Sequence, residues 1–236
     1  MKFGVITFPG SNCDDDMLHI MGEVMGEEVR HLWHKETSLS DFTTNDCIFL
    51  PGGFSYGDYL RSGAIASHSP IMKAVIDFAN NGGYVWGICN GFQVLTESKL
   101  LPGALLRNDN QKFICKNVNL RVETTASPIT SMCTEGEILK IPIAHADGRY
   151  HCDDKTKESL ESNNQILFKY VDQNGEATEV ANPNGSRDNI AGICNANRNV
   201  FGMMPHPERC AEDILGNTDG KKLFEALCEN MKQVLA

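Results

Sequence analysis

The sequence predicts an α/β fold in which a mostly parallel sheet carries helices on both faces. Short apolar runs that suit buried strands alternate with amphipathic runs that suit helices, and this alternation is typical of a parallel sheet. The early strands end in glycine-rich loops. Because ligands bind where the carboxyl ends of parallel strands meet, we expect the loops 9–16, 51–63 and 87–91 to lie close together.

The first half of the chain supplies most of this pattern. An apolar run ends at Pro9 and Gly10, which mark the end of a strand, and three aspartates at 14–16 then open a helix at its positive end. The expected elements, in chain order, are strand 2–8, helix 14–25, strands 28–33 and 47–50, helix 70–79, strand 84–88 and a helix that starts at Asn90.

The second half is less regular. We expect strands or hairpin arms at 111–125, 137–142 and 165–171, a solvated helix or loop at 151–164, two antiparallel strands at 190–194 and 200–204, and a terminal amphipathic helix at 219–235. No repeat, low-complexity tract or obvious linker divides the chain, so the sequence predicts one domain over residues 1–236.

Composition excludes several functional classes. A formal net charge of −10 argues against nucleic acid as the main partner, because phosphate binding needs a basic patch. The nine cysteines are odd in number and contain no Cys-x-x-Cys pair, which disfavours disulfide, zinc and thioredoxin interpretations. The N-terminus lacks a signal-peptide pattern, and no stretch approaches the ~18 apolar residues of a membrane span. We therefore expect a protein of the reducing cytoplasm.

The most informative stretch is 83–96, where a buried strand meets an amphipathic helix at Cys89. Gly87 and Gly91 flank the cysteine and allow the tight turn of a nucleophile elbow, which exposes the sulfur. The free N–H groups at the start of the helix would favour a thiolate and an oxyanion beside it. The alternative is a structural cysteine in a core strand, the commonest fate of a free cysteine.

A thiol nucleophile needs a base, and among seven histidines His206 fits best. Pro207 holds His206 in an extended conformation. In an extended chain residues two apart point the same way, so Glu208 can bind one ring nitrogen and leave the other for Cys89. This is the nucleophile–base–orienter arrangement of acyl-transfer enzymes. The alternative is a loop histidine beside a solvated carboxylate.

Acyl transfer also needs donors to the oxyanion. The N–H of Asn90 is one candidate, and the Gly52–Gly53 turn can bring a second N–H close because no Cβ obstructs it. Gln93 follows Cys89 by one helical turn and therefore lies on the same face of the helix, where it can bind a polar substrate. A glutamine at the edge of the core is the alternative on spacing alone.

Other polar clusters carry weaker signals. His145 follows an apolar run, and we interpret it as a loop histidine that is either a second site element or part of the surface. The contiguous residues 151–154 have metal-ligand types but suit a solvated turn better, so no metal site is predicted. No phosphate-binding glycine motif occurs, so an ATP-driven step must use another polypeptide.

Together these motifs resemble the class I, or triad, glutamine amidotransferase domain. Residues 87–93 look like its nucleophile motif, 51–53 like its oxyanion turn, and 205–208 like its histidine–glutamate motif. The resemblance implies a flavodoxin-like domain with Cys89 as the nucleophile, His206 as general base and acid, and Glu208 as its orienter.

By the same resemblance, Gly53 and Asn90 would supply oxyanion N–H groups and Gln93 would contact the substrate, L-glutamine. The segments 8–14, 50–61 and 142–145 are similar to those of the glutaminase subunits of phosphoribosylformylglycinamidine synthase, a purine-biosynthesis enzyme. This similarity implies a partner synthetase subunit that uses ATP and Mg²⁺, a small accessory subunit, and no cofactor in this chain.

Two features depart from that family or stay without a role. Residues 146–148 read Ala-Asp-Gly where the family carries a Gly-Glu-Gly-like run, and the segment 116–123 matches the family but has no derivable role. Two rival functions remain: a cysteine hydrolase of the protease or chaperone type, and a catalytically silent regulatory subunit. The family also suggests that the isolated chain is a poor glutaminase until its partner binds.

Overall fold

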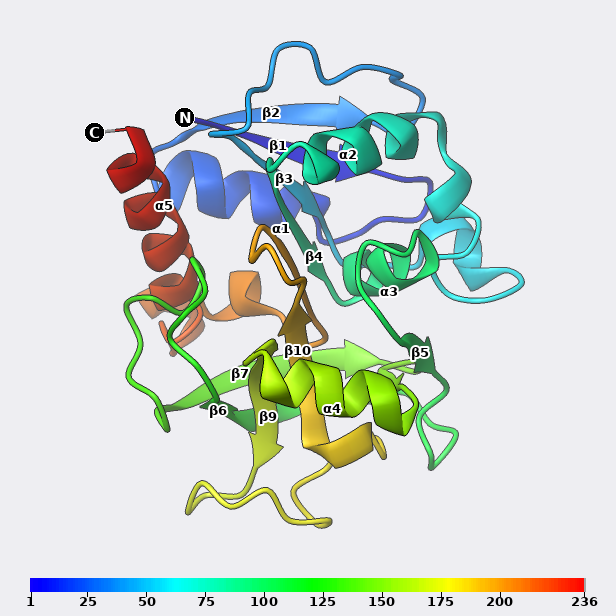
Figure 1. Cartoon of the computed structure of the whole chain (residues 1–236), viewed down its shortest axis with the longest axis vertical. Helices are drawn as coiled ribbons and strands as arrows, with labels where there is room; N and C mark the ends of the chain where they lie inside the picture. Colours follow the sequence, from blue (N-terminus) through cyan, green and yellow to red (C-terminus); the bar gives the residue numbers. More distant parts are fainter. Residues whose placement is uncertain (236) are drawn as a thin grey trace.

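The computed structural model describes residues 1–235, whose main feature is a nine-stranded sheet with strand order β2-β1-β3-β4-β11-β10-β9-β6-β7 (Figure 1). Its strands are β1 (Lys2–Thr7), β2 (Glu28–Trp33), β3 (Cys47–Leu50), β4 (Tyr84–Ile88), β6 (Ile114–Val122), β7 (Ile138–His145), β9 (Ile166–Val171), β10 (Ile190–Cys194) and β11 (Val200–Met203). The helices are α1 (Asp14–His19), α2 (Pro70–Asn80), α3 (Asn90–Glu97), α4 (Asp154–Ser162) and α5 (Lys221–Leu235).

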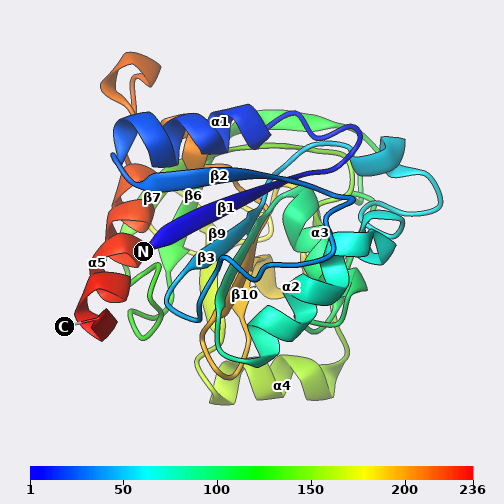
Figure 2. The ribbon, with the colours of Figure 1, turned by 90° about the horizontal axis from the view of Figure 1, so that it is seen from above.

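One half of the sheet is parallel, as the alternating pattern predicts. Strands β2, β1, β3, β4 and β11 pair in parallel, and β4 lies between β3 and β11. Figure 2 shows α1 on one side of these strands and α2 and α3 on the other. On the α1 side, α5 packs Phe224 against Trp86, with 5.1 Å between the ring centroids. The predicted α/β architecture with helices on both faces is therefore confirmed.

The other half is antiparallel and extends the sheet through β10, β9, β6 and β7. The segment 116–123, for which no role could be derived from the sequence, forms most of β6 and pairs with β7 on one side and β9 on the other. Its match to the family is therefore accounted for by a position inside the sheet. A separate pair of three-residue strands, β5 (Ala104–Leu106) and β8 (Arg149–His151), was not predicted, because so short a run carries no periodic signal.

Several local predictions are refined by the structure. The helix expected at 14–25 starts at Asp14, but its second part, Ile20–Val24, is a π-helical turn. The solvated segment at 151–164 forms α4, which Asp153 caps by accepting a hydrogen bond from Thr156 N at 2.8 Å. Within residues 1–235, no helix is both long enough and apolar enough to cross a membrane.

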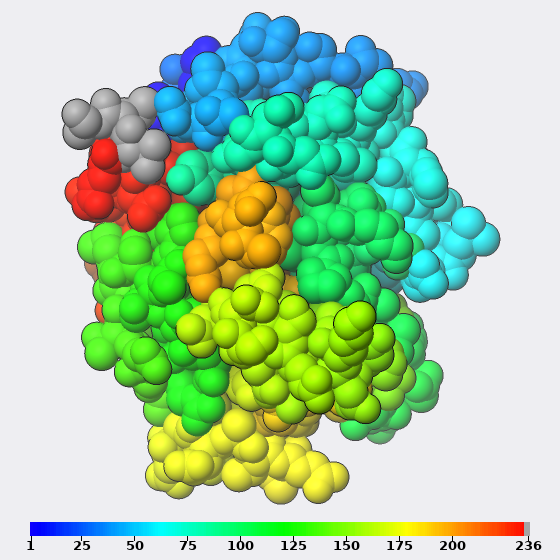
Figure 3. All heavy atoms as spheres, in the orientation of Figure 1, coloured from blue at the N-terminus to red at the C-terminus, as the bar shows by residue number. Residues whose placement is uncertain are grey.

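The loop 51–63 is the most prominent feature at the carboxyl edge of the parallel strands. It contains a tight turn over Ser55–Asp58, in which Tyr56 and Gly57 have positive φ, and it projects from the side of the molecule as the cyan segment of Figure 3. Tyr59 and Leu60 are 74% and 93% exposed, although both are large and apolar. An exposed apolar loop beside the expected site marks a surface suited to contact with another molecule.

Candidate active site

Cys89 lies on the predicted strand-to-helix elbow. It connects β4 to α3 with φ 51° and ψ −104°, a backbone conformation that a non-glycine residue adopts only where the surrounding structure holds it. The N–H of Cys89 donates to the carbonyl of Met203, at the end of β11, over 2.8 Å. A Cβ on Gly91 would lie 1.8 Å from the carbonyl oxygen of Leu50, so only glycine allows α3 to approach β3 this closely.

The three glycine-rich loops meet at this elbow, as predicted. The N–H of Phe54 donates to Gly10 O at 2.9 Å, and the N–H of Cys13 donates to Gly52 O at 3.3 Å. The N–H of Ser55 donates to the side-chain oxygen of Asn90 at 3.2 Å. The carboxyl ends of β1, β3 and β4 thus form one site.

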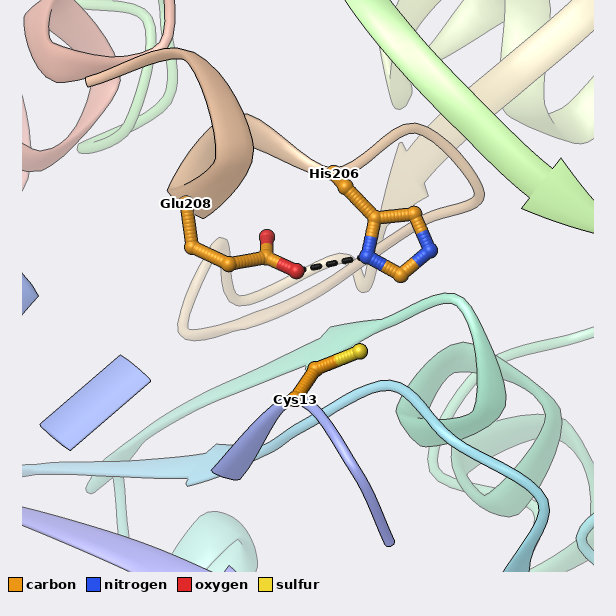
Figure 4. Close-up of side chains that lie close together, drawn as sticks. All are labelled: Cys13, His206 and Glu208. Atoms are coloured by element: carbon orange, nitrogen blue, oxygen red, sulfur yellow. Dashed lines mark hydrogen bonds and ion pairs between the residues drawn. The ribbon is translucent and has the colours of Figure 1, made fainter. Parts of the chain in front are cut away.

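The histidine–glutamate pair reaches the site from the other side of β4. The N–H of His206 donates to Pro142 O at 2.8 Å, which anchors the segment after β11 to β7. His206 Nδ1 lies 2.5 Å from Glu208 Oε1, and both residues are 2% exposed (Figure 4). The predicted contact exists, but the expected extended chain through Glu208 is wrong. His206 is non-helical, with φ −105° and ψ 88°, and residues Pro207–Cys210 form a 3₁₀ turn, because proline suits the first position of a helical turn.

The environment of His206 favours its charged form. Burial lowers the pKa of the ring, but the negative charge of Glu208, with smaller contributions from Cys89 and Cys13, outweighs it and holds the pKa well above the usual value. Nε2 is buried and makes no hydrogen bond to the described residues. The Cys89 thiol instead points towards the carbonyl of Ala144, with Sγ 3.8 Å from the oxygen. Nε2, the nitrogen that faces away from Glu208, is therefore the position that can hold the proton that leaves the thiol of Cys89.

A second cysteine, Cys13, also contacts this pair and was not predicted as a site residue. Its sulfur accepts a hydrogen bond of 3.0 Å from Arg209 Nη2 and lies with His206 and Glu208 in one buried cluster. The sequence held a usable signal, because Cys13 belongs to the family-like segment 8–14 and to one of the loops expected at the site. Cys13 and His206 are nevertheless 193 positions apart in the chain and meet only through the fold.

The predicted oxyanion and substrate residues occupy distinct places. Asn90 is the first residue of α3, so its N–H has no partner within the helix, and Gly53 lines the same hollow as His206. Gln93 is 5% exposed, and its amide is already engaged. Its Nε2 donates to Asp147 O at 2.7 Å, and its Oε1 accepts from Asn90 Nδ2 at 2.8 Å. In this conformation Gln93 ties α3 to the turn after β7.

His145 is neither a loop residue nor a surface residue, and that interpretation is corrected. It ends β7, is 2% exposed, and interacts through Nδ1 with Asn108 Oδ1 at 3.1 Å and through Nε2 with Asn184 Nδ2 at 3.5 Å. Burial, with a smaller contribution from His206, lowers the pKa of His145 to about 3. The neutral ring therefore acts as a hydrogen-bond hub behind the site and not as a base.

The departure from the family run at 146–148 leaves the main contact of that turn intact. Gln93 binds the backbone oxygen of Asp147, which does not depend on the length of the side chain. The shorter carboxylate still accepts from Ser62 Oγ at 3.3 Å and lies 3.5 Å from Arg107 Nη1. The turn is thus held by both backbone and side-chain contacts.

The space at the site is small. A hollow of about 90 Å³ is lined by Cys13, Gly53, Ala144, His206 and Arg209, among others. The Cys89 side chain is not part of this lining and is 4% exposed.

The fold and this arrangement of cysteine, histidine and glutamate define a glutamine amidotransferase domain of the triad class. The sequence profile described as a CobB/CobQ-like glutamine amidotransferase domain matches residues 1–231. The chain is 57% identical to phosphoribosylformylglycinamidine synthase subunit PurQ of Koribacter versatilis, over 96% of this chain and 97% of the relative. It is 56% identical to the protein of the same name from Moorella thermoacetica, over 97% and 96%.

A solved structure, that of PurLQS from Thermotoga maritima, superposes with a TM-score of 0.84 at 42% identity and covers 98% of both chains. The chain therefore belongs to the PurQ family of glutamine amidotransferases, the family of the phosphoribosylformylglycinamidine synthase subunit. The family and the enzyme class predicted from the sequence are confirmed.

Proposed function

We propose that this chain hydrolyses L-glutamine at Cys89 and delivers the ammonia to an ATP-dependent synthetase subunit, which aminates formylglycinamide ribonucleotide in purine biosynthesis. The observation that carries the proposal is the buried His206–Glu208 pair, with 2.5 Å between Nδ1 and Oε1, placed next to the strained elbow of Cys89. A histidine held by a carboxylate beside an elbow cysteine is the arrangement of a nucleophile with its base.

In the first half-reaction the Cys89 thiol gives its proton to Nε2 of His206, and the sulfur attacks the amide carbon of glutamine. The negative charge that develops on the amide oxygen is stabilised by the N–H groups of Asn90 and Gly53. Collapse of this intermediate breaks the C–N bond, His206 returns the proton to the leaving nitrogen, and ammonia departs. A glutamyl thioester remains on Cys89.

In the second half-reaction water attacks the thioester, again with His206 as the base. Glutamate leaves, and the thiol of Cys89 is restored. Glu208 keeps the proton on Nδ1, so that Nε2 stays directed at the reacting atoms, and it stabilises the imidazolium that forms at each step. We assign Gln93 two tasks: it fixes the turn at Asp147, and it contacts the substrate once that turn opens.

The remaining chemistry belongs to a partner. No cofactor is needed for glutamine hydrolysis by this mechanism, and we assign ATP and Mg²⁺ to the synthetase subunit. The related structure is a PurLQS complex, which supports a synthetase subunit of the PurL type and an accessory subunit of the PurS type as partners of this chain. All nine cysteines are free, which supports a cytoplasmic location.

We further propose that the free chain is a poor glutaminase. Three observations support this: Cys89 is 4% exposed, its thiol points at Ala144 O, and the neighbouring hollow holds only about 90 Å³. Partner contacts at the exposed loop 51–63 would reposition the N–H of Gly53 and open the site. A misplaced oxyanion donor costs about 10²–10³ in rate.

The test is ammonia release from glutamine by the chain alone and by the chain saturated with its synthetase, accessory subunit and their substrates. We expect turnover in the complex to exceed that of the free chain by about 10² or more. A free chain as fast as the complex would favour an independent cysteine hydrolase, and no turnover in either state would favour a silent regulatory subunit.

A further inference from the structure

The cluster of Cys13, His206 and Glu208 has the composition of a metal site. Cys13 comes from the loop between β1 and α1, and the other two residues come from the turn after β11. Figure 4 shows the three side chains converging, with the Cys13 sulfur facing the edge of the ring that Glu208 also faces. One ligand atom from each residue lies within 4.8 Å of the others, and each residue is 2% exposed.

The spacing of the three ligand atoms is close to what an ion with tetrahedral coordination requires. Bonds of about 2.0–2.3 Å to nitrogen, oxygen and sulfur place the ligand atoms about 3.3–3.6 Å apart around Zn²⁺. The Nδ1–Oε1 separation is 2.5 Å, and the sulfur lies within 4.8 Å of one ring nitrogen and one carboxylate oxygen, so shifts of about 1 Å assemble the set. Such shifts need only side-chain rotation.

Space and charge also fit a divalent cation. Gly52 leaves room, because a Cβ there would lie 2.6 Å from His206 Cε1 and 3.1 Å from Cys13 Sγ. The adjoining hollow supplies water for a fourth ligand position. A thiolate and a carboxylate together balance the two charges of the ion, and Arg209, 3.0 Å from the sulfur, stabilises the thiolate while it pairs with Asp16 at 3.2 Å.

We propose that Cys13, His206 and Glu208 form an inhibitory site for a thiophilic divalent cation of the Zn²⁺ class. The ion would bind Cys13 Sγ, His206 Nδ1 and Glu208 Oε1 in place of the hydrogen bond between the ring and the carboxylate. The protons of the thiol and of Nδ1 leave to solvent. Glutamine hydrolysis stops because the metal-bound ring of His206 can no longer accept and release a proton. Glu208 also no longer holds the ring by a hydrogen bond.

The participation of Cys13 distinguishes this site from direct binding of the ion to the nucleophile, Cys89. An ion bound between Cys89 and Nε2 would need neither Cys13 nor Glu208. The decisive comparison therefore removes each thiol separately and reads out metal binding as well as activity.

The binding experiment uses Co²⁺ as a probe for thiolate coordination in the full chain carrying Cys89→Ala. We expect a sulfur-to-cobalt charge-transfer band in this variant. The band should disappear when Cys13→Ser is added and persist when Cys115→Ser is added, because Cys115 is an exposed cysteine on β6. Cys13→Ala replaces Cys13→Ser if circular dichroism shows that serine disturbs the fold, and His206→Asn should also remove the band.

The activity experiment titrates Zn²⁺ into the synthetase complex formed with the wild-type chain or with Cys13→Ser. Each rate is expressed relative to the uninhibited rate of the same complex. We expect the Zn²⁺ concentration for half-inhibition to rise about tenfold or more in Cys13→Ser. Loss of a residue that binds the ion directly should cost at least as much affinity as loss of a residue that only supports a ligand. A band that survives Cys13→Ser, no band in Cys89→Ala, or equal sensitivity to Zn²⁺ would overturn the proposal. The cobalt result does not depend on glutaminase activity, so it can fail while the proposed function stands.

Discussion

Two glycine-rich loops leave the carboxyl ends of neighbouring parallel strands, yet they are built in opposite ways. The elbow 87–91, after β4, is entirely buried and is locked between β3 and α3. The loop 51–63, after β3, places Tyr56, Gly57, Asp58 and Leu60 at positive φ and leaves apolar side chains in solvent. The elbow is held by packing on all sides. The loop 51–63 is held at its base by hydrogen bonds to neighbouring segments, while Tyr59 and Leu60 at its tip lie in solvent.

The difference separates two tasks of an amidotransferase. A nucleophile must keep its position to within a fraction of an ångström, and a packed core supplies that precision. An oxyanion donor that responds to a partner must have a second accessible conformation, and an exposed loop has few contacts to lose. We therefore expect substitutions in the elbow to abolish chemistry and substitutions in the loop 51–63 to change its regulation.

The largest effect should follow removal of the nucleophile. Cys89→Ser should abolish glutamine-dependent synthesis in the complex but leave synthesis from added ammonium salt intact, because the ATP-driven step uses the partner subunit. Both activities are measured as product formation by the reconstituted complex. Equal loss of both would contradict the division of labour between the subunits.

The next largest effect should follow Gly91→Ala, which tests the packing of the elbow. The new Cβ would lie 1.8 Å from Leu50 O, so the helix must move, at a cost of about 3 kcal/mol or more in stability. We expect loss of glutaminase activity and a lower midpoint in thermal unfolding. A variant with wild-type stability and activity would show that the elbow is not held by this contact.

Substitutions of the catalytic pair should follow in the order His206→Ala, then Glu208→Gln. Loss of the base should cost about 10⁴ in glutaminase rate, and loss of its charged orienter about 10². Burial lowers the pKa of His206, and the contributions of Glu208, Cys89 and Cys13 together raise it by more. Glu208 makes the largest of these raising contributions, so Glu208→Gln should lower that pKa. A raised pKa keeps the imidazolium to higher pH, hence the alkaline limb of the pH–rate profile should move to lower pH in Glu208→Gln. An unmoved limb, or a larger loss from Glu208→Gln than from His206→Ala, would remove Glu208 from this role.

A smaller and different effect is expected from Gly57→Ala in the exposed loop. Gly57 has φ 69°, and alanine in this region costs about 1–2 kcal/mol, while the nearest atom to the new Cβ is a movable ring carbon of Tyr59 at 3.2 Å. The observed loop conformation therefore loses population, so the free chain should gain glutaminase activity by up to about tenfold. The measured quantity is the ratio of turnover in the complex to turnover of the free chain. An unchanged ratio would mean that this loop does not govern activation.

The smallest effect concerns the charge of the same loop. Burial, and then the charge of Asp147, raises the pKa of Asp58 to about 6. Because the folded pKa exceeds the unfolded value of about 3.9, the folded chain holds this proton more tightly, and stability falls as the pH rises through about 6. Asp58 is partly exposed, so solvent screening limits the effect. Asp58→Asn should raise the unfolding midpoint by about 2 °C at pH 8 and not at pH 4, whereas Asp77→Asn on α2, an exposed control, should do neither.

Much of the fold and of the candidate site could be predicted from the amino-acid sequence. The strands 28–33, 47–50, 84–88 and 190–194 were predicted with the bounds that the structure shows. The last three are short apolar runs that the fold buries, and such runs have few alternatives to a core strand. The elbow cysteine and the His206–Glu208 contact were also predicted, since each depends on residues close in sequence.

The predictions that were wrong or absent depend on contacts between distant segments. His145 follows an apolar run like many loop histidines, and only the packing of Asn108 and Asn184 around it makes it a buried neutral hub. The 3₁₀ turn that carries Glu208 replaced an expected extended chain, although the ring contact survived. Strands β5 and β8 are too short to leave a periodic pattern.

By itself the sequence determined the parallel sheet, the elbow and the class of chemistry, because hydrophobic periodicity and short motifs act over a few residues. The tertiary structure alone decided that Cys13 lies against His206, that Gln93 is bound to Asp147, and that the Cys89 thiol lies near the carbonyl of Ala144. These contacts join residues separated by 54 to 193 positions, and their geometry depends on how the closed core positions each loop. No local pattern can encode that geometry, since it is fixed by the packing of the whole sheet.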